Sequence, residues 1–194
     1  SGYLISSIIS NQIENKKFSF KRFYESRIKR ITPAYYVLLC AVSICIYFIY
    51  IPYDLLHLRT SLKTSLLFLS NLTFSSGDSY FGAKLNENPL LHTWSLAIEM
   101  QFYFILPLII YWVKKSLLPL ITGLVIILIS AYTQYKLNTE GFSSELYFSL
   151  LTRIPEFLIG TFLATAVKNG QLQKVNGGLL SIIGLSLLVF SLLF

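Results

Sequence analysis

Charged residues are scarce in this sequence of 194 residues, and acidic residues are the scarcest of them. Only 13% of the residues are charged, with 9 Asp and Glu against 16 Lys and Arg, whereas 54% are hydrophobic. Soluble globular domains carry about a quarter charged residues, so the composition argues against an ordinary soluble domain. Several apolar runs instead approach or exceed the ~18 residues that indicate a membrane-spanning helix.

Histidine and cysteine are also rare, with His57, His92, Cys40 and Cys45 as the complete set. The two cysteines are five residues apart, a spacing that matches no zinc or redox motif. The sequence contains no glycine-rich phosphate loop, no G-x-S-x-G and no H-E-x-x-H. We therefore expect no bound metal and no resident cofactor in this chain.

The formal net charge of +7 is compatible with a nucleic-acid partner or with anionic lipid. However, the Lys and Arg residues lie mostly between the apolar runs, as the positive-inside rule expects of cytoplasmic loops. No basic domain remains once the predicted spans are removed, so the sequence argues against nucleic-acid binding.

The apolar runs predict an all-α fold, a polytopic bundle of transmembrane helices with about four full spans and several partial ones. The interrupted run 58–74 predicts a short, partial or interfacial helix, residues 75–89 a loop, and residues 177–194 the start of another crossing. Pro33 is expected in the first helical turn of its span. The full spans are predicted at residues 33–51, 94–113, 117–135 and 146–167.

The chain begins without a Met and closes within an apolar run. Residues 2–9 are apolar but too short to span, and they are typical of the end of a preceding helix. We therefore expect residues 1–194 to be part of a single membrane domain that is truncated at both ends.

The polar stretch 10–32 is expected to be a basic cytoplasmic loop in which residues 19–24 form an interfacial amphipathic helix. If residues 58–74 do not cross, most basic residues lie on the side of Arg27, and His92 lies on the outer face. If they do cross, this bias largely disappears.

Three groups of polar residues are candidates for function. Arg27 and Arg30 are three residues apart, so on a helix both guanidinium groups share one face and can clamp a phosphate bidentately. The alternative is that they are simple topology-determining charges.

The second group surrounds Glu99, which falls inside an apolar span where an ionised carboxylate is costly and is normally partnered within the bundle. On a helix that starts near His92, the residues Trp94, Ser95 and Glu99 are predicted to lie near one face. Glu99 then suits a general acid or base, or the orientation of a histidine. The alternatives are an interfacial role for His92, an aromatic-belt role for Trp94 and a structural hydrogen bond for Glu99.

The third group contains Arg153 and Glu156, whose spacing of three residues predicts an ion pair within one helix. Arg153 also has the alternative of pairing with Glu99 across the bundle. Structural pairing and a role in substrate binding therefore both remain open for this group.

The sequence resembles the acyltransferase-3 family of bacterial membrane O-acyltransferases. The most specific match is HTWSLAIEMQFY at residues 92–103, and the other matches, in order, are at residues 1–5, 20–23, 27–33 and 153–160. One departure is Met100, where the family often has Glu or Gln, and this argues against a catalytic role for that position.

The resemblance implies a domain of about ten helices in the bacterial cytoplasmic (inner) membrane. It would move an acyl group, usually acetyl, from acyl-CoA to a carbohydrate hydroxyl of lipopolysaccharide, peptidoglycan or another exported glycan. Arg27 and Arg30 would hold the phosphates of acyl-CoA at the cytoplasmic mouth, and Glu99 and His92 would be the catalytic candidates. The substrate-binding candidates are Trp94, Ser95, Arg153 and Glu156.

The resemblance also implies an essential Arg and His in a first transmembrane helix, which would precede Ser1, so the segment alone is expected to be inactive. Some family members append a periplasmic hydrolase-like domain, and none is found within this sequence. Two other functions remain open on the residues: a transporter or flippase component with Arg153 and Glu99 as a charge relay, and a non-catalytic membrane scaffold.

Overall fold

The computed structural model describes residues 1–49, 52–76 and 88–168, together with residues 178, 181, 185 and 186. Within these ranges the secondary structure is helical and contains no β-strand. Four helical segments in the described part are long and apolar enough to cross a membrane: Phe20–Ile49, Thr93–Trp112, Leu118–Glu140 and Ser144–Lys168. The prediction of an all-α polytopic bundle is therefore confirmed.

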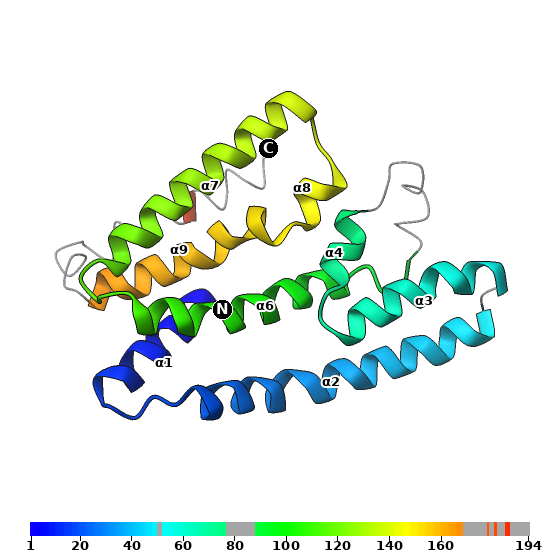
Figure 1. Cartoon of the computed structure of the whole chain (residues 1–194), viewed down its shortest axis with the longest axis horizontal. Coiled ribbons are helices and arrows are strands. Elements are labelled where there is room, and N and C mark those ends of the chain that lie inside the picture. The colour runs from blue at the N-terminus through cyan, green and yellow to red at the C-terminus, as the bar shows by residue number, and fades with distance from the viewer. Residues whose placement is uncertain (50–51, 77–87, 169–177, 179–180, 182–184, 187–194) are drawn as a thin grey trace.

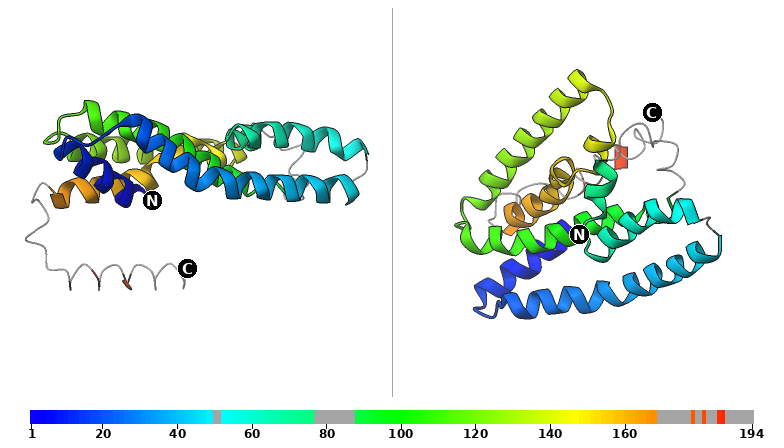
Figure 2. Two further views of the ribbon diagram at one scale, coloured as in Figure 1. Left: turned by 90° about the horizontal axis from the view of Figure 1, so that it is seen from below. Right: turned by 45° about the vertical axis from the view of Figure 1, so that its right-hand side comes forward.

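The helices form a bundle from which one hairpin extends (Figures 1 and 2). In the bundle, α1 packs against α9 and α6, and α7 covers α9. Helices α2 and α3 lie side by side and reach beyond the start of α6 in all three views. The bounds are α1 Gly2–Glu14, α2 Phe20–Ile49, α3 Pro52–Leu66, α4 Ser70–Ser75, α6 Thr93–Trp112, α7 Leu118–Glu140, α8 Ser144–Phe148 and α9 Leu150–Lys168.

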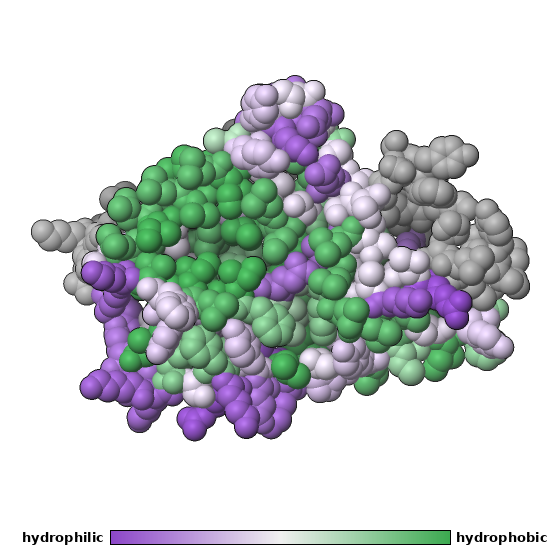
Figure 3. Space-filling model, in the orientation of Figure 1, coloured by the Kyte–Doolittle hydropathy of each residue, from purple (hydrophilic) through white to green (hydrophobic). Residues whose placement is uncertain are grey.

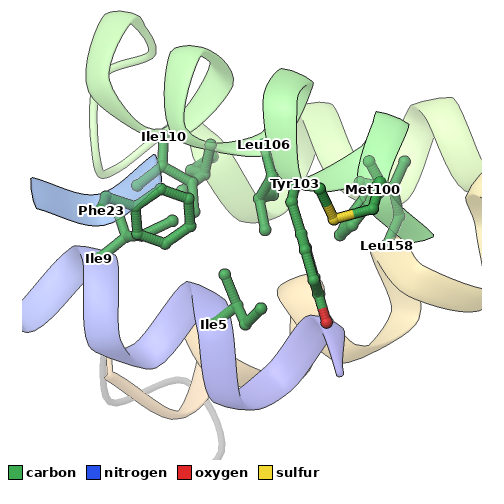
Figure 4. Close-up of a cluster of buried hydrophobic side chains, with 10 residues drawn as sticks. Ile5, Ile9, Phe23, Met100, Tyr103, Leu106, Ile110 and Leu158 are labelled. Carbon is green, nitrogen blue, oxygen red and sulfur yellow. The ribbon is translucent and has the colours of Figure 1, made fainter. Parts of the chain in front are cut away.

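A hydrophobic cluster fills the space where α1, α2, α6 and α9 meet (Figure 4). Ile9 and Leu106 are fully buried in it, and Phe102 stacks on Phe157 of α9 with ring centroids 4.7 Å apart. Met100 is buried in the same cluster, as fits a packing position. At the edge of the cluster, Tyr103 extends from α6 toward the first turn of α1. The cluster thus fixes the positions of α1, α2 and α6 relative to one another.

The predicted start of the first span was wrong. Helix α2 begins at Phe20 rather than near Pro33, so residues 20–32 of the expected basic loop form the first half of one 30-residue helix. Residues 10–14 of that expected loop belong to α1. Pro33 lies inside this helix, where it has no N–H to donate to the carbonyl of Lys29. The many charges of this segment suggested a loop. In the structure they lie on a helix, whose spacing gathers them on polar faces.

Two other predicted segments are divided in the structure. Residues 58–74 do not form one helix, because Phe68, at a φ of 55°, separates α3 from α4. Neither α3 nor α4 is among the candidate spans. The span predicted at 146–167 is interrupted at Ser149, whose extended backbone separates α8 from α9. Most of the crossing predicted at 177–194 and most of the loop at 75–89 lie outside the described residues.

The other two spans agree closely with their predictions. Helix α6 matches residues 94–113 to within one residue at each end, whereas α7 begins at Leu118 and continues five residues beyond the predicted end at Tyr135. Residues 2–9 are helical as predicted, within the longer α1.

Helices α1 and α9 cross at backbone contact. A Cβ atom on Gly160 would lie 2.6 Å from the backbone nitrogen of Tyr3, and one on Gly2 would lie 2.1 Å from the carbonyl oxygen of Phe157. Beside this crossing, Ser6 donates a buried hydrogen bond of 2.9 Å to Thr161. Small residues and hydroxyl pairs of this kind allow close helix packing in membranes, so the crossing fixes α1 against α9.

We expect Gly160→Ala to destabilise the protein by about 1–3 kcal/mol, because its Cβ meets backbone atoms that no rotamer change can move away. The measurement is the thermal unfolding midpoint of the full-length protein in detergent. The matched control is Gly123→Ala, whose Cβ would meet only the Phe162 ring, at 3.6 Å. An equal midpoint for the two variants would contradict the proposed backbone contact.

One end of the bundle collects basic residues around a single carboxylate, and we call it the basic end. Helices α1, α6 and α9 all finish there. Glu14 accepts hydrogen bonds from Lys115 and Lys168, the latter at 2.8 Å. Lys168 also lies 2.5 Å from the Asn11 side-chain oxygen. Glu14 thereby ties the ends of three helices together.

These two ammonium groups, Lys115 first and Lys168 second, hold the pKa of Glu14 below its usual value. A lowered carboxyl pKa contributes stability above the unfolded value of about 4.5, and this contribution is lost as the pH falls through the folded pKa. We therefore expect wild type to melt above Glu14→Gln at pH 7, with a difference that shrinks toward zero as the pH falls below about 4.5 and through the lowered folded pKa. Thermal unfolding midpoints at several pH values measure this, and a difference that grows on acidification would contradict it.

Candidate functional site

Helix α6 presents Glu99 to the groove between α1 and α2. Glu99 is half-buried and accepts a hydrogen bond from the hydroxyl of Tyr103, one helical turn later. The spacing of four residues places both side chains on the same helix face. The carboxylate is therefore held in place by a neighbour on its own helix.

Glu99 and Tyr103 line a cavity of about 340 Å³, a volume within the usual range for small-molecule sites. One wall is apolar and comes from α1, whereas the wall from α2 carries two guanidinium groups. The lining residues are Ser1, Leu4, Ile5, Ile8, Arg27, Arg30, Ile31, Glu99 and Tyr103. The cavity thus combines an apolar side with a charged side.

The cavity has an excess of positive charge. The guanidinium of Arg27 lies over the Phe23 ring at 5.6 Å, and its Nε is buried without a hydrogen-bond partner. Within the described part of the chain, neither Arg27 nor Arg30 has a carboxylate within 4 Å. Two cations therefore face the single carboxylate of Glu99, an arrangement that favours an anionic group in the cavity.

Arg27 and Arg30 lie on helix α2, and not in the basic loop that was predicted for this segment. Phe20 at the start of α2 packs on Tyr111 near the end of α6, with ring centroids 5.2 Å apart, so α2 leads away from the basic end. At 1.5 Å per residue, Arg27 and Arg30 lie about 10 and 15 Å along α2 from that contact. Both line the cavity that holds Glu99, with Arg27 partly buried and Arg30 exposed. The prediction that they share a site on one helix agrees with the cavity lining.

A second cluster is centred on Arg153 of α9. Its guanidinium lies over the rings of Tyr147 at 4.7 Å and Trp94 at 5.4 Å, and it forms an ion pair of 2.7 Å with Glu156. Its Nε also donates to the carbonyl of Tyr147. Arg153 has an exposed fraction of 24% and Glu156 of 61%, so this cluster opens to the outside.

Trp94 and Glu99 do not share a face, contrary to the prediction. Five residues of helix turn the chain by about 500°, or 140° beyond a full turn. Trp94 accordingly packs against Phe148 and Tyr147 of α8, whereas Glu99 faces α1 and α2. Arg153 pairs with Glu156 within its own helix, and no ion pair with Glu99 occurs between these described residues.

His92 and Ser95 lie at the start of α6 and outside the cavity. His92 is exposed at the N-terminal boundary of the helix, and Ser95 donates to its carbonyl oxygen at 3.1 Å. Neither side chain is among the residues that line the Glu99 cavity.

Tyr103 was not among the residues predicted for the site, yet it is the direct partner of the Glu99 carboxylate. The i, i+4 spacing of the two residues is the signal that could have identified it. Among the described residues, no group of three or more His, Cys, Asp or Glu side chains could hold a metal ion.

The sequence profile of the acyltransferase-3 family, described as an acyltransferase domain, matches residues 1–194. The chain belongs to this family. It is thus a multi-pass membrane protein of an acyltransferase family. No solved structure matches it.

Three relatives illustrate the similarity. An uncharacterized protein of Haemophilus influenzae is 37% identical, and the alignment covers 100% of this chain and 83% of that protein. The Peptidoglycan O-acetyltransferase OatA of Listeria monocytogenes is 37% identical over 90% of this chain and 29% of its own length. The O-acetyltransferase OatA of Staphylococcus aureus is 31% identical over 84% and 28%. The chain therefore spans less than a third of the two named relatives.

Proposed function

We propose that this chain forms part of a membrane O-acyltransferase that moves an acyl group, most simply acetyl, from acyl-CoA to a hydroxyl of an exported or cell-surface carbohydrate. The observation that carries the proposal is the cavity in which Arg27 and Arg30 face the Glu99–Tyr103 pair. The names of the Listeria and Staphylococcus relatives support O-acetyl transfer, and the Listeria name supports a glycan acceptor.

The cavity supplies groups for each part of such a transfer. Arg27 and Arg30 hold the donor, and Arg27, with its buried and unpaired Nε, is suited to the negative charge that develops on the carbonyl oxygen. The apolar wall of Leu4, Ile5 and Ile8 suits the acyl end of the donor. Both ends of an acyl thioester thus find a matching surface.

The reaction requires a base, and the resemblance to the family supplies a histidine from a helix that precedes α1. In the proposed step this imidazole removes the proton of the acceptor hydroxyl, and the oxygen attacks the thioester carbonyl. The C–S bond then breaks, and the thiolate of CoA leaves and is protonated. Glu99 orients the imidazole and stabilises its positive charge, while Tyr103 fixes Glu99.

The acceptor is proposed to bind on the side of α6 that faces α8 and α9. There Trp94 offers an aromatic ring, and Arg153 and Glu156 offer charged hydrogen-bonding groups. Ser95 and His92, at the exposed start of α6, complete this surface. Hydroxyl-rich sugars suit such a mixture of rings and charges.

The basic end is proposed to face the cytoplasm of a bacterial inner membrane. Glu14, Lys115 and Lys168 meet there, and Lys16, Lys17 and Lys114 are adjacent in the sequence. An excess of Lys and Arg is typical of cytoplasmic loops. The start of α6 then faces outward, toward an exported acceptor.

The direct test uses cells that express the whole protein and receive labelled acetyl groups through their acetyl-CoA pool. Alkali-labile label on surface glycan is the expected result, since O-acetyl esters are released by base. A transporter or flippase component would instead change the export of a glycan without adding an ester. Unacetylated glycan with normal export would count against both functions.

A further inference from the structure

The turn between α3 and α4, residues 67–69, is polar and has a strained backbone. Phe68 has a φ of 55°, in the left-handed region that residues with a side chain rarely adopt. Next to it, Ser70 Oγ and Asn71 Nδ2 are buried without a hydrogen-bond partner in the part of the chain that the structure describes. Figure 3 shows a paler, less hydrophobic surface toward α4 than over α7 and α9. Such strain persists only where the surroundings hold it, and it is common at functional sites.

Gln101 of α6 holds this turn in place. Its side-chain nitrogen donates to the carbonyl oxygen of Phe68 at 2.9 Å and to Asn71 Oδ1 at 2.8 Å. An amide within a membrane span is costly unless it is hydrogen-bonded, and these two bonds can use both of its N–H groups. The contact with the turn is therefore the reason for a glutamine at this position of an otherwise mainly apolar helix.

The same turn is held by α2. The Phe68 ring stacks on Tyr35, with ring centroids 4.5 Å apart. The Tyr35 hydroxyl donates a buried hydrogen bond of 2.9 Å to the carbonyl oxygen of Ser65, in the last turn of α3. The α3–α4 turn thus joins α6 to α2, with Gln101 on one side and Tyr35 on the other.

Gln101 lies between Glu99 and Tyr103 in the sequence but on the opposite side of α6. Two residues of helix turn the chain by about 200°, so Gln101 points away from the cavity that Glu99 and Tyr103 line. A rotation of α6 that took Glu99 out of the cavity would break both hydrogen bonds of Gln101.

Another link between α2 and α6 lies at Tyr24. Its hydroxyl donates to the carbonyl oxygen of Phe104 at 3.0 Å, and the two rings stack with centroids 5.2 Å apart. The cavity residues Arg27 and Arg30 follow Tyr24 and precede Tyr35 along α2. The α2 wall of the cavity is therefore held at both of its ends, and the α3–α4 turn provides the second link.

We propose that Gln101 is a positioning residue that holds α6 against α2, through the α3–α4 turn, so that Glu99 faces Arg27 and Arg30. In this role Gln101 touches no substrate and acts only through the direction of Glu99. The role of Gln101 in the reaction rests on the proposed function. A displacement of about 1 Å can lower an enzymatic rate on the order of 100-fold, so two hydrogen bonds outside the cavity can have a large effect on the rate.

The first experiment measures the distance between spin labels on α2 and α6 of the full-length protein in detergent. Cys40 is exposed on α2, and Leu108→Cys provides an exposed position on α6, with every other cysteine replaced by serine. A rotation of α6 by about 40° moves a side chain at a radius of ~5 Å by roughly 3 Å. Gln101→Leu should therefore shift or broaden the label distance by about this amount.

The second experiment measures acetyl transfer to glycan. In Gln101→Leu, kcat is expected to fall about 10–100-fold while KM for acetyl-CoA stays within about twofold, because Arg27 and Arg30 remain in place on α2. The matched control is Gln134→Leu, since Gln134 is exposed on α7 and donates to Asn138 of the same helix at 3.1 Å. This control should change neither the label distance nor the rate.

Two substitutions of Tyr35 test the other side of the turn. Tyr35→Phe keeps the ring that stacks on Phe68 and should keep the wild-type label distance. Tyr35→Leu removes the ring and should shift the distance as Gln101→Leu does. Comparison of these two variants also decides the question if Gln101→Leu does not fold.

Equal label distances in wild type, Gln101→Leu and Tyr35→Leu would overturn the role of Gln101 and leave the proposed function intact. A shifted distance with unchanged kcat would also overturn it, because the reaction would then not depend on the position of α6. Wild type that transfers no acetyl group would instead refute the proposed function, and the role of Gln101 in the reaction with it.

Discussion

Glu99→Gln is expected to lower acetyl transfer by the whole protein on the order of 100-fold or more. Glutamine has nearly the same size and can still contact Tyr103, but it cannot carry the negative charge that supports a protonated imidazole. Groups that hold or transfer a proton in acyl transfer contribute about 10²–10⁴-fold to the rate. Because packing is preserved, the loss should appear in kcat with little change in the thermal unfolding midpoint.

The matched control for this change is Glu140→Gln, at the end of α7. Glu140 is an exposed carboxylate that pairs with Lys136 at 3.3 Å, and it lies outside both polar clusters. Its replacement should leave glycan acetylation unchanged. Wild-type acetylation in Glu99→Gln, with equal protein in the membrane, would remove Glu99 from the mechanism.

Arg27→Gln is expected to reduce kcat on the order of 10²–10³-fold, the usual effect of removing one donor that stabilises a developing oxyanion. Arg27→Lys should recover little of this loss, because an ammonium group lacks the planar, five-donor geometry of guanidinium. Arg27 also packs on Phe23, so the thermal midpoint must be measured in parallel. Acetyl transfer from acetyl-pantetheine should fall as much as transfer from acetyl-CoA.

Arg59→Gln is the control for Arg27, since Arg59 is exposed on α3 and does not line the cavity. A result in which Arg27→Gln raised KM for acetyl-CoA and left kcat unchanged would assign Arg27 to phosphate binding and not to the reacting carbonyl. If Glu99→Gln and Arg30→Ala both kept wild-type acetylation, the cavity would not be the active site.

Much of the fold could be predicted from the sequence where an apolar run has clear polar boundaries. Helix α6 was placed to within one residue, because His92 and Lys114 flank a mainly apolar stretch in which Glu99 is the only charged residue. The start of α2 was misjudged for the opposite reason. Its first turns are basic, and a charged helix that lines a polar groove has the composition of a loop.

The candidate site was predictable only in part. The spacing of Arg27 and Arg30 indicated two side chains that share one side of a helix, and both line the cavity. The spacing of Arg153 and Glu156 correctly indicated an ion pair within one helix. The position of Arg27 opposite Glu99 depends on how α2 packs against α6, for which no local pattern in the sequence provides a signal. The break at Ser149 was likewise hidden, because an extended residue between two apolar helices leaves the hydropathy almost unchanged.

The close crossing of α1 and α9 has a consequence for how the protein is made. The hydrogen-bonded residues Ser6 and Thr161 are 155 positions apart in the sequence. At about 5–20 residues per second, a ribosome needs roughly 8–30 s to extend the chain from one to the other. Until α9 has been synthesised, α1 lacks the helix against which the backbone of Gly2 packs. The α1 wall of the cavity therefore reaches its final packing late in synthesis. Chains that end before α9 should therefore present α1 to membrane quality-control proteases.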